Sequence, residues 1–272
     1  MNFQNIPRDD KVVKRAFVPK RDVFIFSDYK QIEPRLTAYF AEKIGFPEFA
    51  DQIRAGVGPY EAVARLATGK ETLTEEERDT WKRIFLGILY GAGVKRVREV
   101  WMEETGEAIT MAEAKNIVST FKKNWPAIPA LQECVQRAAF NRGYIVGLDG
   151  RHLHLEENGE HKLLNKLIQG SAAGIMKRAI LNVHRHLRAH PELETRMVSV
   201  VHDELIGDAP LREVPYFAEQ LPILMREGFE HIHEVVPILV DIEVSSGTWA
   251  DKVSYDEWKE TAVGEGDFVG SA

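Results

Sequence analysis

Two short apolar runs that each end in acidic residues constrain the fold of this chain more than any other feature. Residues 24–28 alternate with the two-residue period of a β-strand, and this run ends at Asp28. A second apolar run covers residues 197–201, and apolar residues resume just after it, so His202 and Asp203 should occupy a tight turn between paired strands. The sequence therefore predicts two carboxylates, far apart in the chain, at strand ends.

Each acidic position has a plain structural interpretation beside a catalytic one. The pattern changes to helical spacing after Tyr29, so Asp28 could be no more than a helix N-cap. The stretch from His202 to Glu204 could be no more than a polar hairpin tip. The alternative is that Asp28 and Asp203 form a catalytic pair, and a third element with different chemistry favours it.

That third element is a helix with a cationic side. Thr74 and Glu77 have capping-box spacing, which predicts a helix that runs to about Tyr90 and stops at Gly91-Ala92-Gly93. Four residues at intervals of four follow one side of it: Arg78, Lys82, Leu86 and Tyr90. A solvated surface would explain the cations alone. A nucleoside triphosphate would use all four positions, with its phosphates at the cations, its sugar at Leu86, and its base or the template at Tyr90.

Composition sets the class of protein. A chain of 272 residues with 44% hydrophobic content can form one large domain or two joined ones. No segment approaches the roughly 20 apolar residues that span a membrane. The N-terminus lacks a signal pattern and Cys134 is the single cysteine, so we expect a cytoplasmic protein without a membrane partner. The net charge of −7 argues only mildly against nucleic-acid binding, which depends on where the basic residues lie.

Local patterns predict an α+β fold, with helices inserted among mostly antiparallel strands. Helices are expected over residues 31–44, 74–90, 94–105, 111–124, 127–142, 164–190 and 212–232. Strands are expected over residues 12–29, in a hairpin within 143–155 around Asp149-Gly150, and over 196–210 and 237–247.

Taken together, these stretches resemble family A DNA polymerases, the DNA polymerase I type. The motifs are DYKQIEPR (28–35, motif A), RDTWKRIFLGILYG (78–91, motif B) and VHDE (201–204, motif C). Supporting matches are NFQNIP (2–7), GYIVGLDGRHLHL (143–155) and NKLIQGSAAGIMKRA (165–179). All six occur in the family's order and cover almost the whole chain. The resemblance implies an antiparallel palm sheet with helices (residues 1–44 and 141–272) and a mostly helical fingers insertion (45–140).

The resemblance implies template-directed DNA synthesis from dNTPs on primer–template DNA, with release of pyrophosphate. Two Mg²⁺ ions, with Mn²⁺ as an alternative, would be held by Asp28, Asp203 and the main-chain carbonyl of Tyr29, with Glu204 as a further candidate. Two carboxylates about 4 Å apart would repel by roughly 4 kcal/mol at an effective dielectric near 20. Bound cations offset this repulsion, so the pair makes sense as a metal site.

The resemblance also implies nucleotide contacts. Arg78 and Lys82 match triphosphate-binding cations, and Lys82 would also assist protonation of the leaving pyrophosphate. Glu33 matches the glutamate that blocks a ribose 2′-hydroxyl, the group that separates RNA from DNA. The full nucleotide-binding set is Arg78, Lys82, Leu86, Tyr90, Glu33, Gln31 and Tyr29. Tyr90 would stack in the template position, and the primer–template contacts would come from Asn165, Gln169 and His202.

The chain departs from the family pattern at four positions. Lys30 and Pro34 stand where serine and leucine are common, and Tyr60 stands where a triphosphate-contacting histidine aligns. A proline is tolerated in the first turn of a helix. Leu86 stands where Phe or Tyr is usual, and we expect a pocket that rejects dideoxynucleotides.

The family's thumb and 3′–5′ exonuclease would precede NFQNIP, directly before which Met1 stands. We therefore expect the palm and fingers half of a split, phage-like polymerase whose separate partner polypeptide carries thumb and exonuclease. A truncated gene product or an expressed fragment is the alternative.

Two rival functions remain beside the polymerase. One is a non-catalytic replication factor that binds primer–template or a replisome partner. The other is a single-subunit RNA polymerase, which Glu33 and its QIEPR context disfavour.

Overall fold

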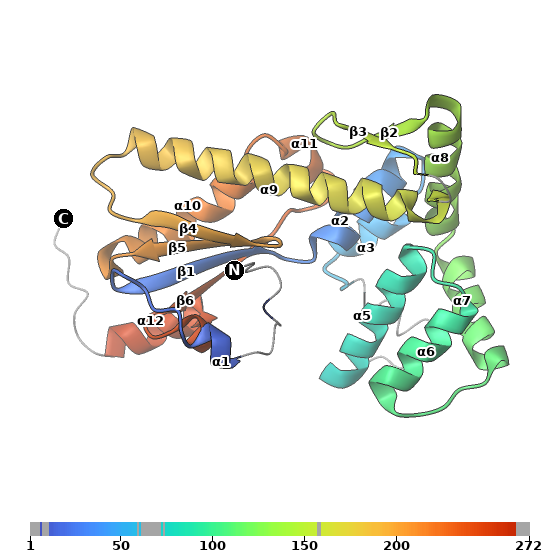
Figure 1. Cartoon of the computed structure of the whole chain (residues 1–272), viewed down its shortest axis with the longest axis horizontal. Coiled ribbons are helices and arrows are strands. Elements are labelled where there is room, and N and C mark those ends of the chain that lie inside the picture. The colour runs from blue at the N-terminus through green and yellow to red at the C-terminus, as the bar shows by residue number, and fades with distance from the viewer. Residues whose placement is uncertain are drawn as a thin grey trace. The chain divides into compact units, whose positions relative to one another are not determined.

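The computed structural model describes residues 6, 11–58, 60, 72, 74–156 and 159–264 (Figure 1). All of the NFQNIP match except Ile6 lies outside these residues. The chain divides into two compact units. The first, here called the sheet unit, comprises Met1–Ile32, Ile175–His233 and Ile238–Ala272. The second, here called the helical unit, comprises Glu33–Gly174 and Glu234–Pro237.

The sheet unit is built on a five-stranded antiparallel sheet with strand order β4-β5-β1-β6-β7. The strands are β1 (Val23–Tyr29), β4 (Arg196–Val201), β5 (Glu204–Ala209), β6 (Val240–Ser245) and β7 (Val253–Ser254). The central strand β1 is buried almost throughout, because α10 packs against β1 and β6 (Figure 1). A strand buried on both faces is rich in apolar residues at consecutive positions, as in VFIF at the start of β1.

The helices of the sheet unit are short, except for α10 and the part of the long helix α9 that begins at Ile175. They are α1 (Lys11–Lys14), η3 (Leu211–Glu213), α10 (Val214–Arg226), α11 (Glu230–His233), η4 (Trp249–Asp251) and α12 (Tyr255–Gly264). Helix α9 (Leu163–Ala189) belongs to both units, as does α2 (Ile32–Lys43). None of the helices described is both long enough and apolar enough to cross a membrane.

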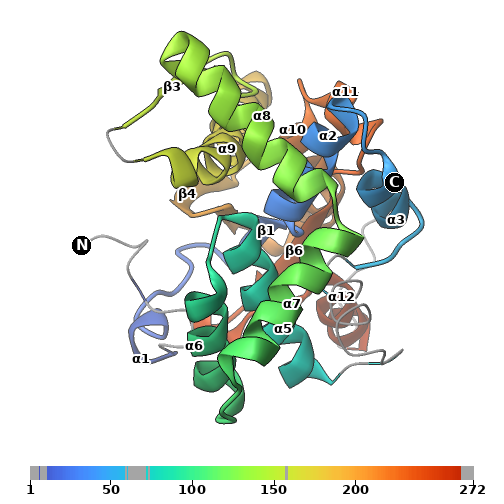
Figure 2. The same ribbon diagram turned by 90° about the vertical axis from the view of Figure 1, so that its right-hand side faces the viewer.

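The helical unit contains α3 (Glu48–Arg54), α5 (Glu75–Leu89), α6 (Val94–Thr105), α7 (Met111–Asn124), α8 (Ala127–Arg142), η2 (Glu160–Lys162) and the hairpin β2 (Tyr144–Val146) and β3 (His152–His154). Helix α6 packs against both α5 and α7 (Figure 2). An aromatic core holds α5 in place. Phe85 of α5 is fully buried, and its ring makes edge contacts with those of Phe49, Tyr60 and Phe121 at 5.6–6.1 Å between centroids.

Most predicted elements are confirmed, with the α+β class among them. The helices expected at 31–44, 74–90, 94–105, 111–124, 127–142 and 164–190 are present, and so are the hairpin and the strands near the C-terminus. The Thr74 hydroxyl accepts a hydrogen bond from the Glu77 N–H, and the Glu77 carboxylate accepts one from the Thr74 N–H. This is the predicted capping box of α5. Pro34 lies in the first turn of α2, where a missing N–H leaves no helical bond unmade.

Two predicted elements were wrong in extent. The strand expected over 12–29 exists only over Val23–Tyr29, because Pro19 cannot donate to a ladder and α1 forms before it. The helix expected over 212–232 is two helices, α10 and α11. Gly228 between them has φ +90°, a left-handed conformation that ends a helix.

Candidate active site

The two motif aspartates meet at one edge of the sheet unit. Asp28 lies near the end of β1 and pairs in register with Glu204, the first residue of the neighbouring β5. Asp203 lies in the β4–β5 turn, and its carbonyl oxygen accepts a hydrogen bond from the Tyr29 N–H at 3.4 Å. Asp28 lies within the strand and α2 begins only at Ile32, so the N-cap interpretation of Asp28 was wrong.

The backbone next to both aspartates adopts an unusual conformation. Among the described residues, Gln31 (φ 52°) and His202 (φ 55°) are the non-glycine residues with positive φ. This region costs a residue with a Cβ atom about 1–2 kcal/mol, and such positions cluster at functional sites. Gln31 follows Asp28 by three residues and His202 directly precedes Asp203. The two strained turns therefore flank the two carboxylates that the motifs predicted.

The Asp28 carboxylate is held in an unfavourable environment. Burial, followed by the negative charges of Asp203 and Glu204, raises its pKa to about 7, against the opposing charge of Lys252. Its Oδ1 atom is buried and has no hydrogen-bond partner among the described residues. A buried carboxylate oxygen without a partner is rare in folded proteins. A cation at this oxygen would satisfy it and offset the neighbouring charges.

The donor set fits a magnesium-type ion better than an all-protein metal cage. Within the described part of the chain, no three His, Cys, Asp or Glu side chains are arranged to hold a metal ion together. Mg²⁺ is usually bound by one or two carboxylates, with waters and substrate phosphates completing its octahedron. Asp28 and Asp203 supply the two carboxylates that such a site requires.

Glu204 is turned toward a lysine that the sequence motifs did not indicate. The Lys252 Nζ lies 2.6 Å from Glu204 Oε1 and 2.5 Å from Glu243 Oε2. Burial disfavours the charged lysine, but the charges of Glu204 and Glu243 outweigh it and raise the Lys252 pKa. Lys252 was missed because its partners are distant in the sequence and only the pairing of β5, β1 and β6 brings them together.

The side chain of Tyr29 is part of the core of the sheet unit. Its ring is buried in the core, and its hydroxyl donates to the Met225 carbonyl at 2.6 Å. Burial, together with the charge of Asp203, raises the pKa of this hydroxyl. The predicted metal contact through the Tyr29 carbonyl remains open, whereas its ring is not available to a nucleotide.

The cationic side of α5 is a half-buried stripe. Trp81, Ile84 and Phe85 on the same helix are buried, whereas all four stripe positions are partly exposed: Arg78, Lys82, Leu86 and Tyr90. The Lys82 Nζ lies 5.9 Å from the centroid of the Tyr60 ring, which supports the lysine side chain from the core side. The stripe is therefore fixed by the helix but open to a ligand.

Glu33 lies beside two further predicted residues of the helical unit, Gln169 and Tyr90. The Gln169 amide of α9 donates to Glu33 Oε1 at 3.2 Å. The Tyr90 hydroxyl is buried near Glu33, and burial, followed by the charge of Glu33 and a side-chain interaction with it, raises the pKa of this hydroxyl. Asn165, one turn before Gln169, has a buried side-chain oxygen without a described partner. These are the positions predicted for sugar, template and primer contacts.

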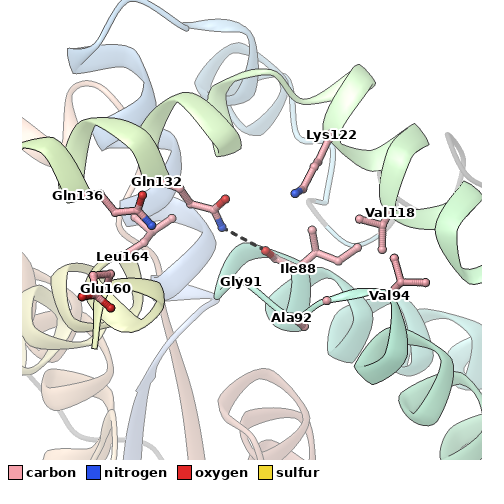
Figure 3. Close-up of a pocket in the computed structure, with 11 residues that line it drawn as sticks. Ile88, Gly91, Ala92, Val94, Val118, Lys122, Gln132, Gln136, Glu160 and Leu164 are labelled. Carbon is pink, nitrogen blue, oxygen red and sulfur yellow. Dashed lines mark hydrogen bonds between the residues drawn. The ribbon is translucent and has the colours of Figure 1, made fainter. Parts of the chain in front are cut away.

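A glutamine from α8 secures the end of α5. The Gln132 amide donates to the Ile88 carbonyl at 3.4 Å (Figure 3). It also donates to the Leu89 carbonyl at 3.1 Å. Both carbonyls lie in the last turn of α5, where carbonyls lack the usual helical partner. The Ile88 carbonyl also accepts from the Gly91 N–H at 3.0 Å, so the glutamine adds a second bond there. Beside it lies a pocket of about 320 Å³ between the end of α5 and α8. No sequence pattern indicates Gln132, because its partners are backbone atoms of another helix.

An antiparallel sheet with two edge carboxylates, and a helical unit with a cationic helix, define an α+β domain of the polymerase palm and fingers type. The family model described as DNA polymerase family A matches residues 1–251. The chain therefore belongs to DNA polymerase family A, whose members use divalent metal ions.

Individual relatives agree with this family. The chain is 29% identical to DNA polymerase I of Lactococcus lactis subsp. lactis over 269 residues, which cover 91% of this chain and 29% of the relative. It is 30% identical to DNA polymerase I of Bacillus subtilis over 267 residues, covering 92% and 29%. Among solved structures, the POL domain of Pol1 from M. smegmatis, in complex with DNA primer-template and dNTP, is 26% identical with a TM-score of 0.75. That match covers 92% of this chain and 44% of the M. smegmatis chain. The chain thus spans less than a third of the length of these two DNA polymerase I relatives.

Proposed function

We propose that this chain carries the nucleotidyl-transfer site of a template-directed DNA polymerase. The observation that carries the proposal is the half-buried Asp28 carboxylate, which lies beside Asp203 in a family A chain. One of its oxygens is buried and has no hydrogen-bond partner among the described residues. A purely structural aspartate would be paired or solvated. The reaction joins a dNTP to the 3′ end of a primer and releases pyrophosphate.

Asp28 and Asp203 would hold two Mg²⁺ ions, or Mn²⁺ in their place, together with the Tyr29 main-chain carbonyl. When bound, such ions stabilise the attacking and leaving oxygens of a displacement at phosphorus. The carboxylates would define the ion positions, because the β1–β5 register and the strained β4–β5 turn fix the backbone at both aspartates. Glu204, held by Lys252, is the weakest of the predicted ligands.

The α5 stripe would bind the triphosphate. Arg78 can pair with phosphate oxygens through two parallel N–H bonds, whereas Lys82 acts as a point charge and can donate a proton to the leaving pyrophosphate. Leu86 would face the sugar, and its small size would disfavour nucleotides that lack the 3′-hydroxyl. Gln31, in its left-handed turn, would contact the same nucleotide.

Glu33 and its neighbours would discriminate deoxyribose from ribose and position the template. The Gln169 hydrogen bond orients the Glu33 carboxylate, which would then exclude a ribose 2′-hydroxyl. Tyr90 would stack in the template position. Asn165, Gln169 and His202 would contact the primer–template, for which the M. smegmatis complex is the solved precedent.

We also propose that synthesis draws on a thumb and a 3′–5′ exonuclease supplied by a separate polypeptide, as in a split, phage-like polymerase. Affinity for duplex DNA comes mainly from many contacts between basic residues and phosphates. A net charge of −7 therefore disfavours tight binding of duplex DNA by this chain alone. The chain covers 29% of each of the two DNA polymerase I relatives compared above. The palm (1–44, 141–272) and fingers (45–140) boundaries and a cytoplasmic location remain predictions.

Primer extension tests this proposal. The chain is mixed with primer–template, dNTPs and Mg²⁺, with and without a polypeptide that carries a family A thumb and exonuclease. We expect weak, distributive extension by the chain alone, and longer products together with co-purification when the polypeptide is added. Binding of primer–template without any extension in either mixture would instead support the non-catalytic replication factor. Processive synthesis by the chain alone would contradict the need for a partner.

A further inference from the structure

The sheet unit places a row of carboxylates on one face. Residues directly opposite in antiparallel strands share a face, and Asp28 lies opposite Glu204 on β5 and Asp241 on β6. Glu243 lies opposite Phe26, two residues before Asp28, and so on the same face. Four carboxylates therefore share the face that carries the candidate metal site, and like charges so placed repel one another.

Lysines neutralise every member of this row except Asp28. Lys30 pairs with Asp241 at 3.4 Å, where both side chains are about half exposed. Lys252 makes two shorter contacts, with Glu204 and Glu243, and its ammonium lies 5.1 Å from the centroid of the Phe26 ring. Asp28 keeps a buried oxygen without a hydrogen-bond partner among the described residues.

The segment that holds Lys252 is well fixed in place. The preceding helix η4 begins with a capping box between Thr248 and Asp251, and Trp249 packs edge-on against Phe17 at 5.6 Å. The following strand β7 pairs with β6. The family model ends at residue 251, so Lys252 and the β7–α12 segment lie just beyond the matched region.

We propose that Lys252 is a positioning residue of the carboxylate site: it holds Glu204 and Glu243 away from the bound divalent cation and leaves Asp28 and Asp203 as the pair that binds it. This inference rests on the proposed function. The lysine replaces what would otherwise be an open cluster of acids by a two-carboxylate site. It also supplies a fixed positive charge close to the cation. This charge weakens cation binding but restricts the cation to the position between Asp28 and Asp203.

Mn²⁺ binding to the whole chain, without DNA or nucleotide, tests the inference through the electron paramagnetic resonance of free Mn²⁺. Lys252→Met keeps the unbranched chain up to the Cε position but removes the charged ammonium. It should tighten Mn²⁺ binding about tenfold, because Glu204 becomes available and a nearby positive charge is lost. Lys252→Arg should bind like the parent. Lys259→Met on α12 is the matched control, since Lys259 is exposed and pairs only weakly with Asp256 at 3.9 Å, and it should also bind like the parent.

A second variant decides the case even if Lys252→Met does not fold, as monitored by circular dichroism. In the parent, Glu204→Gln should change Mn²⁺ affinity by no more than about twofold, because Lys252 already occupies that carboxylate. In Lys252→Met, the same change should return the affinity to the parent value.

Two results would overturn the inference alone: unchanged or weaker Mn²⁺ binding by folded Lys252→Met, or a loss of binding in Glu204→Gln as large as that in Asp28→Asn. Failure of the parent to bind Mn²⁺ at all would overturn both this inference and the metal-site part of the proposed function. The two failures are therefore distinguishable.

Discussion

The carboxylate site of the sheet unit and the cationic stripe of the helical unit are built by different means. The carboxylates meet through strand register, next to two strained turns at Gln31 and His202, and burial works against their charge. The stripe needs only the period of one helix, with its residues half-buried and Lys82 resting over Tyr60. The first site is destabilising without a ligand, whereas the second is an ordinary amphipathic helix. Under the proposed function, the carboxylate site gives up stability for chemistry, whereas the stripe binds the substrate without such a loss.

The largest effect should come from removing a carboxylate that the contrast assigns to chemistry. Asp203→Asn should lower the rate of single-nucleotide incorporation by at least about 10³-fold, because several kcal/mol of metal-derived stabilisation would be lost. Asp241→Asn is the matched control. Asp241 lies opposite Asp28 but is half exposed and pairs with Lys30, so its loss should change the rate by less than about threefold. Equal losses in the two variants would show that the carboxylates act as a general acidic patch.

The stripe should show a smaller, purely ligand-dependent effect. Lys82→Met should lower kcat/KM for dNTPs by about 10²-fold, through the loss of a charge-assisted phosphate contact. Arg83→Met, at the next position on α5, is the control because Arg83 is exposed and pairs with Glu104. It should leave kcat/KM nearly unchanged in steady-state assays. A matching loss in Arg83→Met would mean that the basic residues of α5 act only through their summed charge.

The stability of the carboxylate site should depend on pH in a direction opposite to that of an ordinary ion pair. The folded-state pKa of Asp28 is raised from 3.8 to about 7, so the folded chain holds this proton more tightly and loses stability as pH rises between these values. In metal-free buffer, Asp28→Asn should raise the free energy of unfolding by about 2 kcal/mol at pH 8, once the full shift is discounted for partial exposure. The gain should shrink as pH falls toward 4. Urea unfolding at several pH values measures it, and a pH-independent gain would argue against a charged, buried Asp28.

The smallest effect concerns the sugar. Leu86→Tyr should raise the ratio of dideoxynucleotide to deoxynucleotide incorporation by about tenfold, since it changes one contact at the 3′ position. Leu181→Tyr, at an exposed leucine of α9, is the control and should leave the ratio unchanged. Unchanged dideoxynucleotide inhibition of Leu86→Tyr would remove Leu86 from the nucleotide site.

The two regions also differ in how far the sequence could predict them. Periodicity and capping located α5 and the order of its stripe almost to the residue, because helical structure is local. The strand–turn–strand around Asp203 was equally readable. Lys252, Glu243 and Gln132 were not, since each acts through partners that only strand pairing or helix packing brings near. The strand predicted over 12–29 was too long, because its start was read from apolar residues and not from the proline that precedes Val23. The N-cap role of Asp28 was wrong because the strand runs on to Tyr29 and the left-handed Gln31 separates it from the helix.

Template-directed incorporation of a single nucleotide tests the central claim most directly. Four primer–templates that differ only in the templating base are each offered the four dNTPs singly with Mg²⁺, in the presence of the thumb-bearing polypeptide, by the parent chain and by Asp203→Ala. We expect the parent to add only the complementary nucleotide on each template, and Asp203→Ala to add none. Addition that ignores the templating base, equal addition by Asp203→Ala, or no addition on any template would contradict the assignment of Asp28 and Asp203 to DNA synthesis.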